Sequence, residues 1–231
     1  MGILLYIFIF LFPLAFKSCK DAKSSGMVFN DVYDLRWDNR TTYRAFCNMT
    51  FNGGGWTVLQ RREDEYVDFN RNWTEYVIGF GNPYGSHWLG LEAMHQLTKE
   101  GNITIRFDVR DINGSRGYAE YGNFKIAEEG LKYRISLSHY RGTIGDGMAK
   151  SNGKPFSTVD RDNDDSYVNC ASTSKGPWWH YDCFEVNLNS NFGSLPTTVV
   201  NPPGGDQMSW LPWKGQYGGI IFSEIKLRAE N

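Results

Sequence analysis

Alternating hydrophobic and polar residues predict several β-strands in the middle of the chain. In the segment 102–112, NITIRFDVRDI, every second residue is hydrophobic, and a period of two is typical of a half-buried strand. Similar patterns occur in TVLQRR at 57–62, in two strands of 118–140 joined by an EEG turn, and in GIIFSEIKLRAE at 219–230. We therefore predict a central antiparallel sheet that the segment 219–230 re-enters.

The regions around this sheet predict two more short strands and one helix. Residues 27–29 and 41–48 have strand character, and GGGW at 53–56 predicts a sharp turn. The segment 86–98, SHWLGLEAMHQLT, predicts a helix capped by Ser86, with Leu91, Met94 and Leu97 on one face. His95 is interpreted as a boundary residue of this helix and not as a catalytic group. The fold class is therefore α+β with few helices.

The regular pattern stops at residue 142, and Gly, Asn, Asp, Ser and Pro dominate until about 215. A connection of this length needs an ion, a disulfide or packed aromatic residues to order it. It contains DRDNDD at 160–165, and carboxylates at alternate positions, Asp160, Asp162 and Asp164, can converge on a calcium ion. An EF-hand is excluded, since Asp165 and Ala171 occupy its Gly and Glu positions. From spacing alone, a solvated turn is the alternative.

Composition favours one extracellular domain without a nucleic-acid partner. The 231 residues can form a single core, and 24 basic against 26 acidic side chains give no field that attracts phosphate backbones. The apolar run at 3–16 resembles the core of a secretory signal, so we expect residues 1–18 to be a signal peptide that is removed, without membrane insertion. A buried strand or an uncleaved anchor is the alternative.

Cysteines and glycosylation sequons agree with export. Five N-x-[ST] sequons are N-glycosylation candidates, at Asn39, Asn48, Asn72, Asn102 and Asn113. The four cysteines, Cys19, Cys47, Cys170 and Cys183, predict two disulfides with three permitted pairings. Short loops lose less entropy on closure, which favours Cys19–Cys47 and Cys170–Cys183.

No catalytic constellation is present in the sequence. There is no G-x-S-x-G or H-E-x-x-H motif, and GTIGDG at 142–147 has the wrong spacing to cradle phosphate. A carboxylate-pair hydrolase built from Asp162, Asp164 and Asp182 would conflict with calcium ligation. We therefore expect a binding protein and not an enzyme.

Five segments together resemble the fibrinogen C-terminal globular domain. They are CNMTFNGGGWTVLQRREDEYVDFNRNWTEYVIGFG, HWLGLEAMHQLT, FSTVDRDNDDSYVNCA, GPWWHYDCFEVNLN and SEIKLR, in this order. The resemblance covers Cys19 to the C-terminus and implies one domain at 19–231. It implies three subdomains: an N-terminal one at about 19–56 containing a Cys19–Cys47 disulfide, a central sheet at about 57–140 plus 219–231, and a calcium-binding lobe at about 141–218.

The resemblance also implies a ligand set for the ion. Its carboxylates fall on Asp162 and Asp164 and its backbone carbonyls on Ser166 and Val168, which makes Asp160 a turn residue outside the set. The family further implies a cis peptide bond between Asp182 and Cys183. In its lectin members this bond aims a backbone N–H at an acetylated sugar.

The binding pocket departs from the lectin pattern at several positions. Lectin members have a His after the second cysteine, a Tyr-Ala pair before the following Trp, and a later Tyr. Their places are taken here by Phe184, by Gly204 with Gly205, and by Gln216. The expected pocket therefore comprises Asp182, Cys183, Phe184, Gly204, Gly205 and Gln216, with walls that have lost polar and aromatic groups. Trp178 and Trp179 are expected to pack the lobe.

Two binding functions follow from these features. The first is a secreted, calcium-binding recognition module of lectin-like or innate-immune type with a non-standard pocket, bound to a glycan. The alternative is an extracellular protein-binding module of matrix or receptor-signalling type, which the missing pocket walls favour. The short segment before Cys19 carries no stalk for avidity, so we expect weak single-site binding unless the heads form a homo-oligomer.

Overall fold

A computed structural model describes residues 15–37, 41–183, 185–192, 206–215 and 219–230. Its elements are α1 (Cys19–Ser24), β1 (Asp31–Arg36), β2 (Thr42–Asn48), a 3-10 turn η1 (Phe51–Gly53), β3 (Trp56–Arg62), α2 (Trp73–Ile78), β4 (Phe80–Gly81), β5 (His87–Trp88), α3 (Leu91–Thr98), β6 (Ile103–Asp111), β7 (Arg116–Ile126), a 3-10 turn η2 (Glu129–Leu131), β8 (Ile135–Gly142), α4 (Cys170–Thr173), β9 (Val186–Asn187), β10 (Ser209–Trp210), α5 (Leu211–Lys214) and β11 (Ile220–Ala229). None of the helices in these described ranges is long and apolar enough to cross a membrane.

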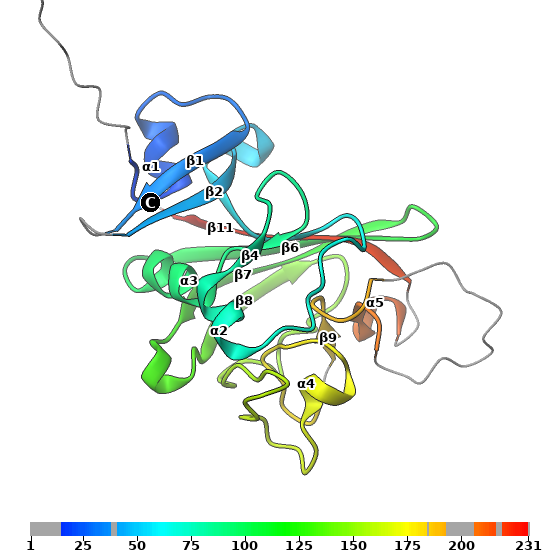
Figure 1. Ribbon diagram of the computed structural model, residues 1–231. Helices are drawn as coiled ribbons and strands as arrows, with labels where there is room; N and C mark the ends of the chain where they lie inside the picture. The colour runs from blue at the N-terminus through cyan, green and yellow to red at the C-terminus, as the bar shows by residue number, and fades with distance from the viewer. Residues whose placement is uncertain (1–14, 38–40, 184, 193–205, 216–218, 231) are drawn as a thin grey trace, which may run out of the picture.

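One antiparallel sheet organises the molecule (Figure 1). Its strand order is β1-β2-β3-β11-β6-β7-β8, and the short β5 and β4 continue from the edge of β3. The predicted return of segment 219–230 is confirmed, since β11 pairs with both β3 and β6. The α+β class is likewise confirmed, with short helices and a dominant antiparallel sheet.

Strand β6 shows how the sequence pattern produces the core. Its hydrophobic residues are buried on one face, where the Phe107 ring lies 5.5 Å from the ring of Trp210. Its partner β7 and the next strand, β8, which pairs with β7, form the two predicted strands, and the predicted EEG turn forms part of η2. Alternation therefore identifies the sheet correctly, because the strand has one apolar and one charged face.

Strand β3 is more buried than its pattern predicts. All seven residues from Trp56 to Arg62 are buried, although alternation predicts a half-buried strand. The polar side chains on β3 have partners: Gln60 Nε2 donates to Leu188 O at 2.9 Å, and Arg62 donates to Ser190 O at 2.8 Å. Long polar side chains are compatible with burial when their hydrogen bonds are satisfied.

The predicted helix at 86–98 is correct in type but begins five residues late. It starts at Leu91, because His87 and Trp88 pair as β5 with β3 and β4. Ser86 is not its cap: the Ser86 hydroxyl donates to Asp64 instead. The strand predicted at 27–29 is also wrong, since β1 begins at Asp31.

The lobe is defined here as the described residues between β8 and β11. In Figure 1 its α4 and long loops lie below the central strands of the sheet, and α1 lies above them beside β1 and β2, which form one end of the sheet. Trp178 and Trp179 are buried, and the Trp179 ring packs against Trp88 and Phe156 at 6.2 and 5.0 Å. The expectation that these tryptophans pack the lobe is confirmed.

Candidate calcium and ligand-binding lobe

The acidic segment belongs to a loop that is closed at its base. Ser157 and Trp178 exchange two backbone hydrogen bonds, at 2.9 and 3.2 Å, which hold the ends of the loop together. Within the loop, Asn163 donates to Phe156 O and Asn169 donates to Thr158 O. Asn side chains therefore bind backbone groups that no helix or strand satisfies.

Asp160 faces α2 and not the other aspartates. Its Oδ1 accepts hydrogen bonds from the Trp73 amide at 2.9 Å and from the Thr158 hydroxyl at 2.7 Å. The Trp73 amide is the first of helix α2, so Asp160 places a negative charge at the helix N-terminus. It is a turn and cap residue, as the resemblance implies, and not the third carboxylate that spacing alone predicts.

Asp162 and Asp164 lie side by side. The Asp164 amide donates to Asp162 Oδ1 at 3.2 Å, and the Asp164 carboxylate accepts from the amides of Ser166 and Cys170, each at 3.0 Å. Burial, together with a smaller contribution from the neighbouring charge of Asp162, raises the pKa of Asp164 to about 6. A cation between the two groups would offset both effects.

Two backbone carbonyls of the same loop could supply further oxygen ligands for a hard cation. The carbonyls of Ser166 and Val168 receive no hydrogen bond from any described residue, so their lone pairs are available. Calcium takes six to eight oxygen ligands, which carboxylates, carbonyls and water can supply together. Among the described residues no group of three His, Cys, Asp or Glu side chains could hold a metal, so the candidate site depends on two carboxylates with backbone oxygens.

A disulfide links the ion loop to the expected ligand pocket. Cys170, whose amide binds Asp164, is bonded to Cys183, and the second disulfide joins Cys19 to Cys47. Of the three pairings that sequence permits, the structure therefore contains the one favoured by short loops. Movement of the aspartates is coupled covalently to the segment that carries Asp182 and Cys183.

Sequence reasoning missed the role of His180, whose ring is fully buried between the backbone at Gly176 and the backbone at Cys183. Its Nδ1 lies 2.9 Å from Cys183 O, and its Nε2 lies 2.9 Å from Gly176 O. Burial lowers the pKa of His180 to about 4, so the ring is neutral at physiological pH and donates to only one of the two carbonyls. No sequence motif identifies this residue, because both of its partners are backbone atoms.

The expected ligand pocket is only partly within the described residues. Phe184, Gly204, Gly205 and Gln216 lie outside them, whereas Asp182 is exposed beside the half-buried Cys183. The described chain contains no cis peptide bond, so the Asp182–Cys183 bond is trans and the cis expectation is wrong. The trans form is the lower-energy form of a peptide bond that does not precede proline.

The glycosylation candidates differ in exposure. Asn72, Asn102 and Asn113 are exposed, whereas Asn48 is partly buried and its Oδ1 accepts from the amides of Thr50 and Phe51. Asn39 lies outside the described residues. Glycosylation at these positions remains a prediction.

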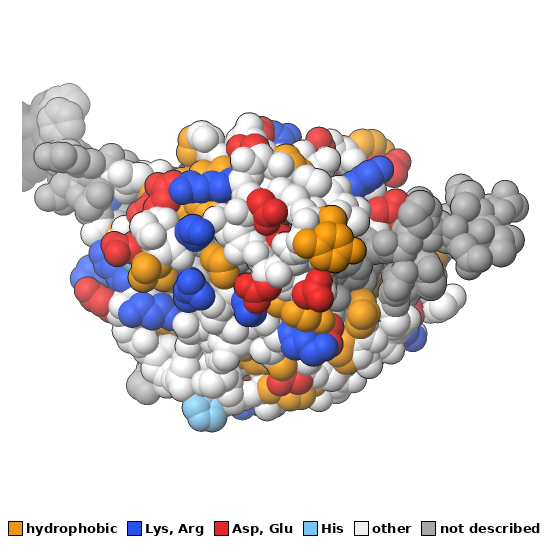
Figure 2. Space-filling view, turned by 90° about the horizontal axis from the view of Figure 1, so that it is seen from below, with side chains coloured by type: hydrophobic (Ala, Val, Ile, Leu, Met, Phe, Trp, Pro, Cys, Tyr) orange, Lys and Arg blue, Asp and Glu red, His pale blue; other side chains and the backbone are white. Residues whose placement is uncertain are grey.

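The described residues form no patch of a single charge on the face of the molecule that carries the lobe. Figure 2, seen from below Figure 1, shows Lys and Arg side chains interspersed with Asp and Glu, and hydrophobic side chains scattered among them. The lobe therefore offers no extended electrostatic surface for a polyanion.

Comparison with known proteins places these features in one family. A family model described as the C-terminal globular domain of fibrinogen beta and gamma chains matches residues 15–230. Tenascin of Gallus gallus is 39% identical over 214 residues, which cover 92% of this chain and 11% of tenascin. The chain thus spans a small part of the length of its tenascin relatives.

Solved structures show the same fold. The fibrinogen-like globe domain of human ANGPTL6 superposes with a TM-score of 0.87 at 34% identity, covering 96% of this chain and 99% of that domain. Lamprey fibrin D-dimer, solved in complex with the peptide Gly-His-Arg-Pro-amide, superposes with a TM-score of 0.86 at 29% identity, covering 95% of this chain and 76% of that one.

Proposed function

Because the chain belongs to the family of fibrinogen C-terminal globular domains, we propose that it is an extracellular recognition module whose lobe binds Ca²⁺ and a polypeptide ligand. One observation carries this proposal: the adjacent carboxylates of Asp162 and Asp164 lie in a loop that a disulfide ties to Asp182 and Cys183. The ion would neutralise the two carboxylates and fix the loop, and the fixed loop would position the neighbouring segment for its ligand.

The extracellular location is supported by the two disulfides and by the relatives. Disulfides persist in oxidising compartments and are rare in the cytosol. The apolar segment 3–16 fits a secretory signal, although residues 1–14 lie outside the described part of the chain. We therefore propose that the protein is secreted after removal of this segment.

The composition of the site predicts moderate calcium affinity. Only two carboxylates contribute charge, and affinity increases with the number of charged ligands and with the rigidity of the site. We expect a Kd of about 0.1–1 mM, the range of extracellular calcium modules. At that affinity the site would be filled outside the cell, where calcium is millimolar.

A polypeptide ligand is favoured over an acetylated sugar for two reasons. The polar and aromatic walls of the lectin pocket are replaced at Phe184, Gly204, Gly205 and Gln216. In addition, a structural relative of this chain, lamprey fibrin, is solved with a bound peptide. No catalytic constellation competes with this proposal, so we propose binding and not catalysis.

Metal titration tests the ion site. Terbium replaces calcium, and its emission is sensitised by a nearby tyrosine; Tyr167 lies between Ser166 and Val168 and is 98% exposed. We expect terbium emission that millimolar Ca²⁺ displaces and that Asp164→Asn removes. Asp165→Asn is the matched control, because Asp165 lies in the same loop but pairs with Lys154.

Two tyrosine variants locate the metal. Tyr167→Phe should remove most of the sensitised emission, whereas Tyr66→Phe should leave it unchanged, since Tyr66 is 89% exposed in a different loop. Emission that survives both Asp164→Asn and Tyr167→Phe would show that the ion binds elsewhere and would contradict the proposed site.

Ligand arrays test the ligand class. A peptide array and a glycan array are probed in 2 mM Ca²⁺ (about the extracellular level) and in EDTA, with Asp164→Asn as the control. We expect calcium-dependent signals on peptides. Calcium-dependent signals on N-acetylated sugars alone would overturn the polypeptide proposal and restore the lectin interpretation.

A further inference from the structure

The sheet face that points away from the lobe contains a hollow of about 490 Å³. In β6, Phe107 and Val109 face the core, so the alternating residues Asp108 and Arg110 face the opposite side. The hollow lies on this charged side, and its lining includes Phe51, Glu63, Asp108, Arg110, Arg116 and Phe222. Nothing in the proposed function of the lobe uses this region.

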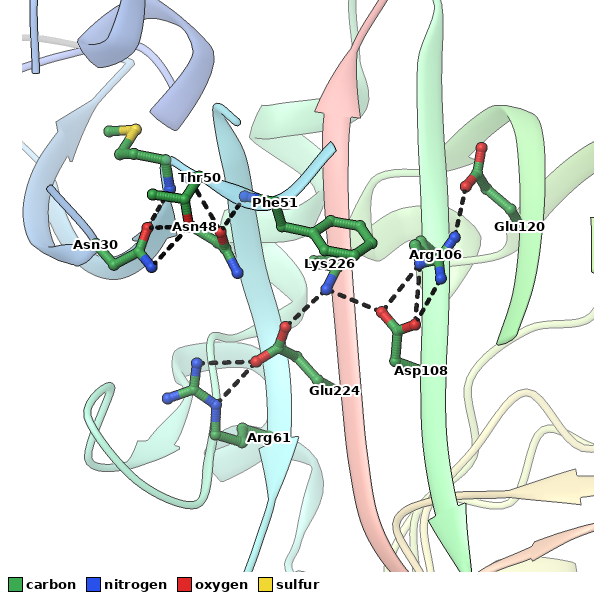
Figure 3. A network of polar contacts seen from close by, with 11 residues as sticks. Asn30, Asn48, Thr50, Phe51, Arg61, Arg106, Asp108, Glu120, Glu224 and Lys226 are labelled. Carbon is green, nitrogen blue, oxygen red and sulfur yellow. Dashed lines mark hydrogen bonds and ion pairs between the residues drawn. The ribbon is translucent and has the colours of Figure 1, made fainter. Parts of the chain in front are cut away.

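Most charges beside the hollow already have partners (Figure 3). Lys226 Nζ lies 2.9 Å from Glu224 and 2.8 Å from Asp108, and Glu224 also pairs with Arg61 at 2.9 Å. Arg106 pairs with Asp108 at 2.8 Å and continues the network across the sheet. These groups neutralise one another, so their charges are not available for a ligand.

Among the cationic groups of the lining, Arg110 and Arg116 are the exceptions. They lie directly opposite each other in the β6–β7 register, an arrangement that is destabilising for like charges. Neither forms an ion pair with any described residue, and the buried Nε of Arg110 has no hydrogen-bond partner among them. The Arg110 guanidinium lies over the Phe222 ring, 5.5 Å from its centroid. Two adjacent guanidinium groups without an acceptor form a site for an oxyanion.

We propose that this hollow binds an acidic side chain of an extracellular polypeptide, with its carboxylate held by Arg110 and Arg116. The neighbouring groups favour a polypeptide over a sulfated glycan. Phe51 and Phe222 offer apolar contact to flanking residues, and Glu63, which forms no ion pair with the described residues, can accept a backbone N–H. The carboxylate of Glu63, which no cation of the described residues neutralises, would disfavour a ligand that carries several negative charges.

Short peptides test the proposal on the whole protein in saturating Ca²⁺. The probe is N-acetyl-Phe-Glu-Phe-amide, and N-acetyl-Phe-Gln-Phe-amide is the neutral match. The readout is the Nε–H resonances of ¹⁵N-arginine-labelled protein. We expect the Glu peptide to shift the Arg110 and Arg116 signals with a millimolar Kd, and Arg110→Gln to weaken binding about 10–100-fold, the effect of losing charge-assisted hydrogen bonds.

Controls separate this site from general charge effects and from the lobe. Arg134→Gln removes an exposed arginine whose partner is the Gly153 carbonyl, and it should leave peptide binding unchanged. Asp164→Asn should also leave it unchanged, because the hollow lies on the opposite side of the sheet. This proposal is therefore tested independently of the calcium site.

A charge reversal gives a second readout. Arg116→Glu replaces the like-charge pair with an ion pair, so it should raise the Tm by about 1–3 °C while abolishing binding of the Glu peptide. Equal shifts with the Gln peptide, no binding at all, or no effect of Arg110→Gln would overturn the proposal. Tighter binding of a heparin disaccharide than of the Glu peptide would replace it with a glycan site.

Discussion

The central sheet and the lobe are ordered by different kinds of interaction. In the sheet, β11 pairs along its length with β6 and β3, and backbone ladders satisfy most polar groups. In the described part of the lobe, regular structure is limited to short pieces such as α4 and the two-residue strands β9 and β10. Side chains there satisfy backbone groups that strand pairing satisfies in the sheet. Backbone carbonyls accept hydrogen bonds from Asn163, Asn169, Asn187 and Asn189.

This difference determines how each region responds to change. A ladder of many equivalent hydrogen bonds tolerates the loss of one, whereas a loop held by single groups depends on each of them. The lobe should therefore be the part that a ligand, an ion or a substitution alters first. Four measurements follow, from the largest expected effect to the smallest.

Removing the aromatic contact between the two regions should have the largest effect. Phe156 is buried and its ring packs against Tyr76, Trp88 and Trp179 at 5.0–6.0 Å. We expect Phe156→Ala to lower the free energy of unfolding by about 3–5 kcal/mol in urea denaturation. Phe29→Ala is the control, since Phe29 is 77% exposed. An equal loss in both variants would contradict the role of this contact.

The two disulfides offer a matched comparison between the lobe and the N-terminal region. Replacing both cysteines of either pair with Ala should cost about 2–4 kcal/mol. Only the Cys170 and Cys183 variant should also lose calcium affinity, because the Cys170 amide binds the Asp164 carboxylate. Isothermal titration with Ca²⁺ measures this difference. Unchanged calcium affinity in that variant would show that the Cys170–Cys183 disulfide does not support the ion loop.

His180 should make the stability of the lobe sensitive to acid. The pKa of His180 is about 4 in the folded protein and about 6.5 in the unfolded chain, so acidification protonates the unfolded chain first. The stabilisation present above pH 6.5 is lost as the pH falls toward 4, by roughly 2–3 kcal/mol at pH 4.5.

Urea denaturation at several pH values checks this loss. His180→Gln should reduce the pH dependence of unfolding between pH 4.5 and 6.5 whatever its effect on stability at pH 7. Replacement of His139, which is exposed on β8, should leave the pH dependence unchanged. An identical profile for wild type and His180→Gln would rule out the histidine as the source.

Helix caps provide the smallest and closest comparison. Asn169 caps α4 in the lobe and accepts from the Ser172 amide, and Asn72 caps α2 and accepts from the Glu75 amide. Each Asn→Ala change should cost about 1 kcal/mol in thermal unfolding. Asn169→Ala should also weaken calcium binding, because the Asn169 side chain donates a hydrogen bond to Thr158 O within the ion loop. Asn72→Ala should leave calcium binding unchanged. Equal calcium affinities would show that this link is dispensable.

Sequence patterns predict the sheet better than the lobe, for a physical reason. The alternation in β6 and β11 reflects one buried and one charged face, and it can be recognised from neighbouring residues alone. The late start of α3 could not be predicted, because β5 forms through pairing with β3. Helix α2 was missed although its signal was present: Asn72 and Glu75 have the spacing of a capping box.

The candidate site was only partly predictable from its own residues. The spacing of Asp162 and Asp164 predicts a carboxylate pair, but the hydrogen bond that Asp160 accepts from α2 depends on Trp73, 87 positions away. His180 and the pair Arg110 and Arg116 gave no motif, because their roles arise from backbone partners and strand register. Long-range packing thus decides which polar residues become sites.

The central position of β11 has a consequence for biosynthesis. Its neighbours β3 and β6 precede it by more than one hundred residues. In a nascent chain, the edge of each strand that β11 will cover therefore stays unpaired until residues 220–229 leave the ribosome. Exposed strand edges and distant pairings make folding slow and invite association with other chains. Chaperone protection during translation is therefore expected to matter more for this domain than its size suggests.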